Sequence, residues 1–296
     1  MSLRRVAGLA MAGAAGCVAY GSLVERRWYR LARLTVPGAL RREGRLRVLH
    51  LSDLHLVAGQ EHRRRFVAGL ADLDHDLVVV TGDLLGAPGV EALAASTLAP
   101  LTGPGRPGLV VLGSNDRFAP VPRAPWTYFA GPSSGRVGQR LETDRLVELL
   151  AEHGYRTLED ATALVETRAG PVAVAGLADP HLPWTRLPPA DALRPVDDAE
   201  TVLNLGLVHS PYLAALDVLA EAGYDLLLAG HTHGGQVRLP GVGALVSNCD
   251  LPLDRARGLS RHRDRWLHVS VGLGHSRYAP FRFACRPEAT LLELTA

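Results

Sequence analysis

The stretch Leu226-Leu227-Leu228-Ala229-Gly230-His231-Thr232-His233-Gly234-Gly235-Gln236 places two histidines and two glycines directly after an apolar run that ends in Gly230. A short apolar run bounded by glycines is typical of a buried strand that ends in a turn. Glycine adopts backbone conformations that other residues avoid, and it lets an ion or a substrate approach the chain closely. Loops at strand ends often carry binding sites, so His231 and His233 are candidates for metal ligation. Because a His-x-His pair alone is weak evidence, the other strand ends decide the question.

Four earlier apolar runs also predict strands, and each ends in side chains that can bind a metal. Leu46–Leu51 precedes Asp53 and His55, Leu77–Val80 precedes Asp83, Leu109–Leu112 precedes Asn115 and Asp116, and Leu203–Val208 precedes His209. Helical spacing of apolar residues predicts helices over Glu61–Leu73 and Val90–Leu98, between the first three of these strands. Successive strand-helix units predict an α/β fold with a mostly parallel sheet and right-handed crossovers.

Seven oxygen and nitrogen donors therefore follow five strands. They are Asp53, His55, Asp83, Asn115, His209, His231 and His233. A donor set of carboxylates, an amide and imidazoles without thiolate suits Mn, Fe or Zn rather than a structural cysteine-rich zinc site. One ion needs fewer donors than seven, so we expect two divalent ions with one carboxylate between them. A lone Asp after a strand is usually a helix cap, but chance is a poor account of five such strand ends in order.

The remaining elements are predicted from shorter patterns. Helices are expected over Arg140–Ala151 and Tyr212–Ala222, and strands over Pro171–Gly176, Asp225–Ala229, Val237–Leu239, Trp266–Val271 and Thr290–Leu294. The segment Pro120–Gly138 is rich in Pro and Gly, and it is expected to be irregular, either a lid over a site or a packed surface loop. Cys249 and Cys285 could form a disulfide or remain two buried thiols.

The N-terminal segment differs from the rest of the chain. Val6–Val24 contains no charged residue, and arginines flank it on both sides. A helix of this length would be about 28 Å long, close to the hydrocarbon thickness of a bilayer. We therefore expect residues 1–35 to be a signal anchor or transmembrane segment with a linker, and residues 45–296 to be one domain at the cell membrane. The distribution of arginines leaves the side of the membrane open.

The overall charge of the chain gives no reason to expect a nucleic-acid partner. The formal net charge is +2, with 21% charged and 47% hydrophobic residues. Two segments are basic, Arg63–Arg65 and Arg255–Arg265, but no aromatic residues that could stack on bases are interleaved with them. A nuclease remains an alternative, and salt-dependent DNA binding would reveal it.

Taken together, the motifs Asp-x-His, Gly-Asp, a Gly-Asn-like turn, His and Gly-His-x-His resemble those of the calcineurin-like metallophosphoesterases. The resemblance covers residues 45–296, and it is strongest with a subgroup that carries Gly-His-Thr-His-Gly-Gly-Gln, an N-terminal apolar segment and an ending like Pro280-x-Arg282. It implies a four-layer αββα sandwich of two mixed sheets. It also implies that one metal is held by Asp53, His55 and His233, that the other is held by Asn115, His209 and His231, and that Asp83 bridges them.

The third motif departs from the family pattern. The family usually has Gly-Asn-His followed by Asp or Glu, where Asn is a ligand and His acts on the phosphoryl group, whereas this chain has Gly113-Ser114-Asn115-Asp116. Aligned without a gap, Ser114 takes the ligand position and Asn115 the catalytic one. With a slip of one residue, which we prefer because an amide oxygen is the better ligand, Asn115 is the ligand and Asp116 replaces the histidine. His62, His181 and His275 are further candidates for that role.

The resemblance implies a phosphoester hydrolase, and we expect a phosphodiesterase in which a hydroxide between two metals attacks phosphorus in line. The alternative is a metal-binding scaffold on the same fold whose catalytic role is reduced, which the altered third motif favours. The substrate class is a phosphoester, and a membrane location would suggest a lipid or a component of the cell envelope.

Overall fold

A computed structural model describes residues 2–122, 124, 127, 137–196, 199–275 and 277–296, apart from the side chains of residues 3, 4 and 6–10. Most of the expected irregular segment Pro120–Gly138 lies outside these residues, so its role stays a prediction.

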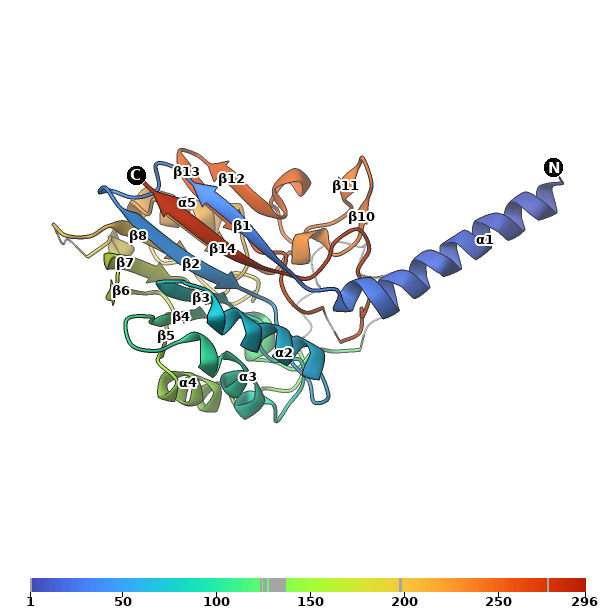
Figure 1. The fold of residues 1–296 in the computed structure, drawn as a ribbon, viewed down its shortest axis with the longest axis horizontal. Coiled ribbons are helices and arrows are strands. Elements are labelled where there is room, and N and C mark those ends of the chain that lie inside the picture. The colour runs from blue at the N-terminus through green and yellow to red at the C-terminus, as the bar shows by residue number, and fades with distance from the viewer. Residues whose placement is uncertain (1, 123, 125–126, 128–136, 197–198, 276) are drawn as a thin grey trace.

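Two six-stranded sheets form the centre of the molecule (Figure 1). The first has the order β1-β14-β2-β3-β4-β5, and its strands are β1 (Arg30–Val36), β14 (Glu288–Thr295), β2 (Arg45–Leu51), β3 (Leu77–Thr81), β4 (Gly108–Val111) and β5 (Tyr155–Thr157). The second has the order β12-β13-β9-β8-β7-β6, with β12 (Gly258–His262), β13 (Arg265–Val269), β9 (Leu226–Ala229), β8 (Leu203–Leu207), β7 (Gly170–Gly176) and β6 (Ala161–Thr167). A small hairpin joins β10 (Arg238–Leu239) to β11 (Gly243–Ala244).

Both sheets are mixed. In the first, β2 through β5 run parallel, and β14 is antiparallel to β2 but parallel to β1. In the second, β7, β8, β9 and β13 run parallel, whereas β6 and β12 run antiparallel to their neighbours. This arrangement confirms the expected pair of mixed sheets.

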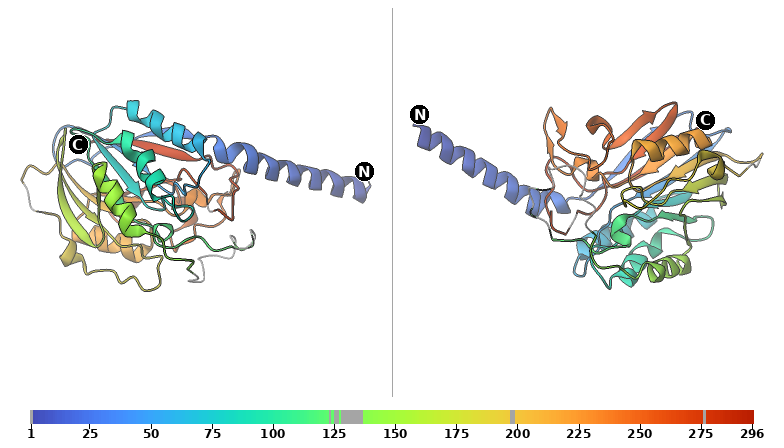
Figure 2. Two further views of the ribbon diagram at one scale, coloured as in Figure 1. Left: turned by 90° about the horizontal axis from the view of Figure 1, so that it is seen from below. Right: turned by 180° about the vertical axis from the view of Figure 1, so that it is seen from behind.

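Helices cover the outer face of each sheet, as Figures 1 and 2 show. The helices α2 (Glu61–Gly69), α3 (Glu91–Leu98) and α4 (Thr143–Glu152) pack on the first sheet, and α5 (Leu213–Ala222) packs on the second. Short 3₁₀ turns occur at Glu25–Arg27, Leu70–Asp72, Ala99–Leu101, Ser114–Asp116, Ala190–Leu193, His233–Gly235 and Leu253–Arg255. The result is helix, sheet, sheet, helix, which confirms the predicted four-layer αββα sandwich.

Side chains alternate between the two faces of each strand, so the first sheet contributes to two hydrophobic cores, one on each face. In β2, Leu46 and Val48 face the second sheet, while Leu49 and Leu51 face the helices. Successive side chains of a strand point to opposite faces, so a strand buried on both faces is apolar throughout. This is why the central strands could be predicted from predominantly apolar runs, although β2 also carries Arg47 and the buried His50.

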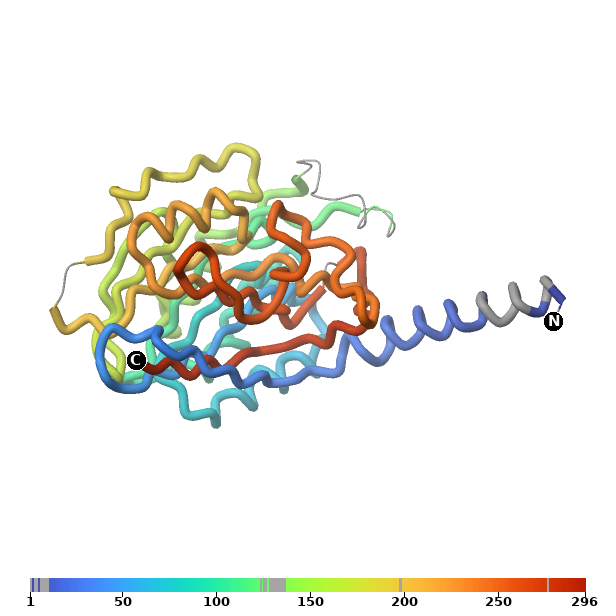
Figure 3. Tube along the Cα trace, turned by 90° about the horizontal axis from the view of Figure 1, so that it is seen from above, coloured from blue at the N-terminus to red at the C-terminus, as the bar shows by residue number. Residues whose placement is uncertain are grey.

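The N-terminal helix α1 (Leu3–Ala19) projects from the sandwich, as Figures 1 and 3 show, and it continues into the π-helical turn Tyr20–Val24. Among the described residues, no helix has both the length and the apolar character that crossing a membrane requires. The membrane segment predicted for Val6–Val24 therefore stays a prediction.

The segment that we expected to be a linker is part of the fold. Residues Arg30–Val36 form β1, which pairs in parallel with β14 along seven residues and adds an edge to the first sheet. Five residues earlier, Glu25 is 2% exposed, and its carboxylate accepts hydrogen bonds from the backbone N–H groups of Ala284 (3.0 Å) and Cys285 (2.6 Å). The domain therefore includes residues well before 45. Cys285 and Cys249 are both free thiols, so the disulfide alternative is wrong.

Candidate metal centre

The predicted ligands meet at one end of the sandwich. They follow β2, β3, β4, β8 and β9, whose carboxyl ends lie together because β2 to β4 and β8 to β9 run parallel. Six of the seven side chains are buried, with exposed fractions from 0% to 9%, namely Asp53, His55, Asp83, His209, His231 and His233. Burial of this many polar groups is costly unless they are paired or bind an ion.

One cluster reproduces the first ligand set that the resemblance implied. The ligand atoms of Asp53, His55 and His233 all lie within 4.8 Å of one another. The Nε2 atoms of the two histidines are 3.2 Å apart, and His233 Nε2 is 3.5 Å from Asp53 Oδ1. Two imidazole nitrogens and a carboxylate oxygen that converge in this way are suited to a divalent cation.

Asp83 lies between the two halves of the site. Its Oδ2 atom is 3.5 Å from Nε2 of His55 and 3.5 Å from Nε2 of His209. Asp83 and His209 also form a second cluster with Asp53 within 4.8 Å. Asp83 Oδ2 thus contacts one histidine from each of the two predicted ligand sets. His231 belongs to neither cluster of three, although its backbone N–H donates to the Asp53 carboxylate at 3.1 and 3.2 Å.

Backbone carbonyls fix the tautomers of two histidines. A carbonyl can only accept, so His209 Nδ1 donates to Thr81 O at 2.6 Å and His231 Nε2 donates to Asn248 O at 3.2 Å. Each bond leaves the other ring nitrogen available as a ligand, which is the usual outer-shell arrangement of metal-binding histidines. Within the described part of the chain, His209 Nε2 is buried and forms no regular hydrogen bond, and Asp83 Oδ2 lies 3.5 Å from it. The site therefore fits a cation by its donor chemistry and by this buried nitrogen.

Burial sets the protonation of the centre. It lowers the pKa of His55 to about 4 and lowers the pKa of His231 and of His233 well below the usual value, so these rings are neutral near pH 7. Neutral imidazole is the form that binds metal. Burial also raises the pKa of Asp53 to about 7. For His209, burial acts downward, but the neighbouring carboxylates, Asp83 first, raise its pKa well above the usual value. In the metal-free chain a proton on His209 compensates the neighbouring carboxylates, and this proton must leave Nε2 before that nitrogen can bind a cation.

The backbone of the site is strained. Five of the seven predicted ligands have left-handed backbone conformations, namely Asp53 (φ 52°), His55 (φ 42°), Asp83 (φ 55°), His231 (φ 68°) and His233 (φ 51°). Such conformations cost of order 1 kcal/mol or more each in a residue other than glycine, and they gather at functional sites. The strain was not predictable from the motifs.

Two glycines leave the space that the centre needs. A Cβ at Gly113 would lie 2.2 Å from Asp83 Oδ1 and 2.8 Å from His209 Nε2. A Cβ at Gly230 would lie 1.9 Å from Ser52 Oγ and 2.8 Å from Asp53 Oδ2. Any side chain at either position would displace a predicted ligand, which explains sterically why both motifs contain glycine there.

In the third motif, Asn115 and Asp116 have different surroundings. The side-chain amide of Asn115 donates to Asp83 Oδ2 at 2.7 Å, and its backbone N–H donates to Asp83 Oδ1 at 2.9 Å. Asp116 is fully buried, and its carboxylate accepts four backbone N–H bonds, from Asp83 (2.8 Å), Leu84 (2.7 Å), Leu85 (3.1 Å) and Gly113 (3.0 Å). These contacts place Asn115 at the centre and give Asp116 a structural task, while the catalytic role predicted for Asp116 stays a prediction.

The three other candidate histidines lie in different places. His62 is exposed on α2, and His275 lies 3.3 Å from a guanidinium nitrogen of Arg26. His181 is the one that reaches the centre, because its ring centroid is 4.5 Å from that of His231 and its Nδ1 is 3.1 Å from the Tyr212 hydroxyl.

Two buried arginines support the ligand loops. Arg282 is fully buried, and its guanidinium donates to the carbonyls of Val271, Gly272, Gly274 and Cys285, and one of its nitrogens lies 3.3 Å from His233 Nδ1. Arg63 is 2% exposed and donates to the carbonyls of Leu54 and His55. The Pro-x-Arg motif pointed to Arg282, but no sequence signal separated the buried Arg63 from Arg64, which is half-buried, and Arg65, which is exposed.

With this geometry in place, comparison with known proteins decides the family. The model of the calcineurin-like phosphoesterase family matches residues 46–235. This chain belongs to the calcineurin-like phosphoesterase family. It is therefore a phosphoester hydrolase with candidate sites for divalent metal ions.

Three relatives illustrate the range of similarity. The uncharacterized metallophosphoesterase YkoQ of Bacillus subtilis (strain 168) is 28% identical over 251 residues, which cover 84% of this chain and 84% of that protein. The phosphodiesterase YaeI of Escherichia coli (strain K12) is 31% identical over 150 residues, half of each chain. A transmembrane protein with metallophosphoesterase domain of Danio rerio is 26% identical over 265 residues, which cover 84% of this chain and 53% of that protein.

Proposed function

We propose that this calcineurin-like phosphoesterase is a phosphodiesterase that holds two divalent metal ions. The observation that carries the proposal is the position of Asp83, whose Oδ2 is equally far, at 3.5 Å, from a histidine of each half of the site. Asp53, His55 and His233 would hold one ion, and His209, His231 and Asn115 the other. Mn, Fe and Zn all suit these donors.

When bound, two such ions lower the pKa of a water molecule and stabilise negative charge on the oxygens of a phosphoryl group. The residues of the chain orient and shield that chemistry. Thr81 O and Asn248 O hold the rings of His209 and His231 in one tautomer. The side-chain amide of Asn115 donates to Asp83 Oδ2 at 2.7 Å and so orients the proposed bridging carboxylate. The ring centroid of His181, which lies outside the ligand set, is 4.5 Å from that of His231, and we assign to His181 the contact with the leaving group.

Diester specificity is supported by YaeI, which is named a phosphodiesterase. The test is elemental analysis of the purified full-length chain together with hydrolysis of bis-p-nitrophenyl phosphate and p-nitrophenyl phosphate, with and without added Mn. We expect about two ions per chain, metal-dependent turnover and faster cleavage of the diester. Two ions without turnover would favour the scaffold alternative instead. A chain that binds no metal, and is not rescued by added metal, would contradict the ligand assignment.

Substitution of Asp83 tests the bridging role. Asp83→Asn keeps the shape of the side chain but removes its charge, so we expect fewer than two ions per chain and turnover reduced by a factor of about 1000. The matched control is Asp254→Asn, because Asp254 is an exposed carboxylate of the 3₁₀ turn Leu253–Arg255. Full turnover of the Asp83 variant would refute the assignment.

The proposal extends to a membrane location, with α1 as the point of attachment. It is supported by the absence of charge in Val6–Val24, by the flanking arginines and by the name of the Danio rerio relative. Attachment would bring lipid or cell-envelope phosphoesters within reach. Sedimentation of the full-length chain with phospholipid vesicles tests the proposed attachment. The control is a variant that lacks residues 2–19, which should stay in the supernatant. If the full-length chain also stays in the supernatant, the proposed attachment is contradicted.

A further inference from the structure

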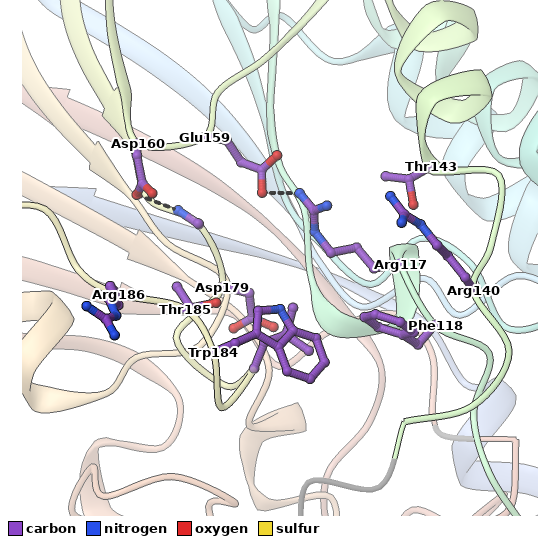
Figure 4. Close-up of a pocket in the computed structure, with 12 residues that line it drawn as sticks. Arg117, Phe118, Arg140, Thr143, Glu159, Asp160, Asp179, Trp184, Thr185 and Arg186 are labelled. Carbon is purple, nitrogen blue, oxygen red and sulfur yellow. Dashed lines mark hydrogen bonds and ion pairs between the residues drawn. The ribbon is translucent and has the colours of Figure 1, made fainter.

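A pocket of about 480 Å³ lies beside the metal centre, and the proposed hydrolysis leaves it without a role (Figure 4). Two segments that line it continue directly from the centre. Arg117 and Phe118 follow the third motif, and Asp179 lies two residues before His181, whose ring is 4.5 Å from that of His231. A phosphodiester bound at the centre therefore has this pocket within reach of one of its two ester groups.

The charges around the pocket are balanced. Arg117, Arg140 and Arg186 line it together with Glu159, Asp160 and Asp179, as Figure 4 shows. Arg117 forms an ion pair with Glu159, and Asp160 accepts a hydrogen bond from the backbone N–H of Ala178 at 3.0 Å. A pocket with equal numbers of both charges has no net attraction for a second anion. It offers many donors and acceptors, which is the chemistry that recognises hydroxyl groups.

Asp179 supplies an acceptor that has no partner. Its side chain is 1% exposed, and one carboxylate oxygen accepts the backbone N–H of His181 at 3.1 Å. Within the described residues, the other oxygen, Oδ2, is buried and makes no hydrogen bond. A buried carboxylate oxygen without a donor is unfavourable, so a ligand hydroxyl that donates to it would be bound strongly.

An exposed indole completes the pocket. Trp184 is 55% exposed, although it is among the largest apolar side chains of the protein. Its ring and that of Phe118 form an edge-to-face pair, with centroids 5.5 Å apart and an interplanar angle of 77°. The edge contact holds the indole in place and leaves area on its face for a flat, weakly polar ring surface.

We propose that this pocket is a subsite for a sugar ring, and that the substrate is a phosphodiester in which one ester group is a sugar. One face of the ring lies on Trp184, and a ring hydroxyl donates to Asp179 Oδ2. The inference rests on the proposed function, because the metal centre must hold the phosphoryl group that the sugar carries.

The test compares four phosphate monoesters that differ in one property at a time. Glucose 1-phosphate has a ring with hydroxyls, glycerol 3-phosphate has hydroxyls without a ring, phenyl phosphate has a ring without hydroxyls, and methyl phosphate has neither. Their dissociation constants are measured by calorimetry with the metal-loaded, full-length chain. We expect glucose 1-phosphate to bind about tenfold more tightly than the other three.

Three variants test which residues produce the preference for glucose 1-phosphate. Trp184→Ala and, independently, Asp179→Asn are expected to reduce the preference for glucose 1-phosphate below about threefold. Trp28→Ala is the matched control, because Trp28 is 52% exposed in the N-terminal region, where it contacts Arg286, and it should keep the preference.

Two results would overturn the sugar subsite while the phosphoesterase proposal stands. They are equal binding of all four esters, and a preference that survives Trp184→Ala. Tightest binding of phenyl phosphate would also overturn it, in favour of a plain aromatic group. If none of the four esters binds to the metal-loaded chain, the proposed function itself fails.

Discussion

Substitution of Asp116 distinguishes a catalytic role from a structural one, because the sequence predicts the first and the hydrogen bonds of the structure indicate the second. The altered third motif made it the candidate that replaces a catalytic histidine. In the structure, its carboxylate accepts four backbone N–H bonds and thereby holds the loop of Asp83 against the turn that begins at Gly113. We therefore predict that Asp116→Asn acts first on stability.

The size of the expected loss of stability follows from the fact that each carboxylate oxygen accepts two of these bonds. Oδ1 of Asp116 accepts from Leu84 and Leu85, and Oδ2 accepts from Asp83 and Gly113. Whichever oxygen becomes the amide NH₂, two buried N–H groups lose their acceptor. Each such loss costs about 1–3 kcal/mol, so the free energy of unfolding should fall by roughly 2–6 kcal/mol. That is a large part of the total for a typical domain.

The assay is urea unfolding of the full-length, metal-free chain, followed by circular dichroism at pH 8. At this pH Asp116 is ionised, because burial and the charge of Asp83 raise its pKa only to about 7. The control is Asp254→Asn, which should stay within about 0.5 kcal/mol of wild type. If Asp116→Asn unfolds like the control but loses turnover, the structural reasoning is refuted and the catalytic role predicted from the motif stands.

Three further predictions concern stability. Burial lowers the pKa of His268 to about 3, so the folded state keeps this ring neutral while the unfolded chain protonates it below about pH 6.5. Its contribution to stability should therefore fall by about 2 kcal/mol between pH 6.5 and 5, and urea unfolding of His268→Gln should show a correspondingly smaller loss over this range. Deletion of residues 2–36 removes β1, and it should lower the thermal midpoint by several degrees, whereas deletion of residues 2–19 should leave the midpoint nearly unchanged. Arg282→Lys supplies too few donors for the carbonyls that Arg282 contacts, so we expect a loss of about 2 kcal/mol or more in the same unfolding assay, and an unchanged value would show that these contacts are dispensable.

The strands that could be predicted are the central ones. The strands β3, β8 and β9 are buried along their whole length and β2 along most of it, and predominantly apolar runs marked all four. In the two six-stranded sheets, the strands that escaped prediction, β1, β5, β6 and β12, are the four edges; the two-residue strand β11 of the small hairpin was also missed. An edge strand is partly exposed, and in Arg30–Val36 arginine and leucine are mixed without the strict alternation that marks a half-buried strand.

For the site, the sequence identified which residues could bind a metal and that they would lie close together. It did not identify the backbone conformations and the second set of side chains that hold them there. Asp53, His55 and His233 meet as the resemblance implied. The left-handed backbone at these residues depends on tertiary contacts, so no local pattern reveals it. The roles of Arg63 and Asp116 also depend on which carbonyls and amides the fold brings near them.

The attachment of α1 has a mechanical consequence. Glu25, at the base of the helix, bonds to the backbone of Ala284 and Cys285, and the carbonyl of Gly21 accepts the backbone N–H of Arg282 at 3.3 Å. Tension applied along α1 would therefore reach the loop of Arg282 through Glu25, five residues before Arg30, where β1 first pairs with β14. Since a guanidinium nitrogen of Arg282 lies 3.3 Å from His233 Nδ1, a pull on α1 would be transmitted to a predicted metal ligand through a few hydrogen bonds.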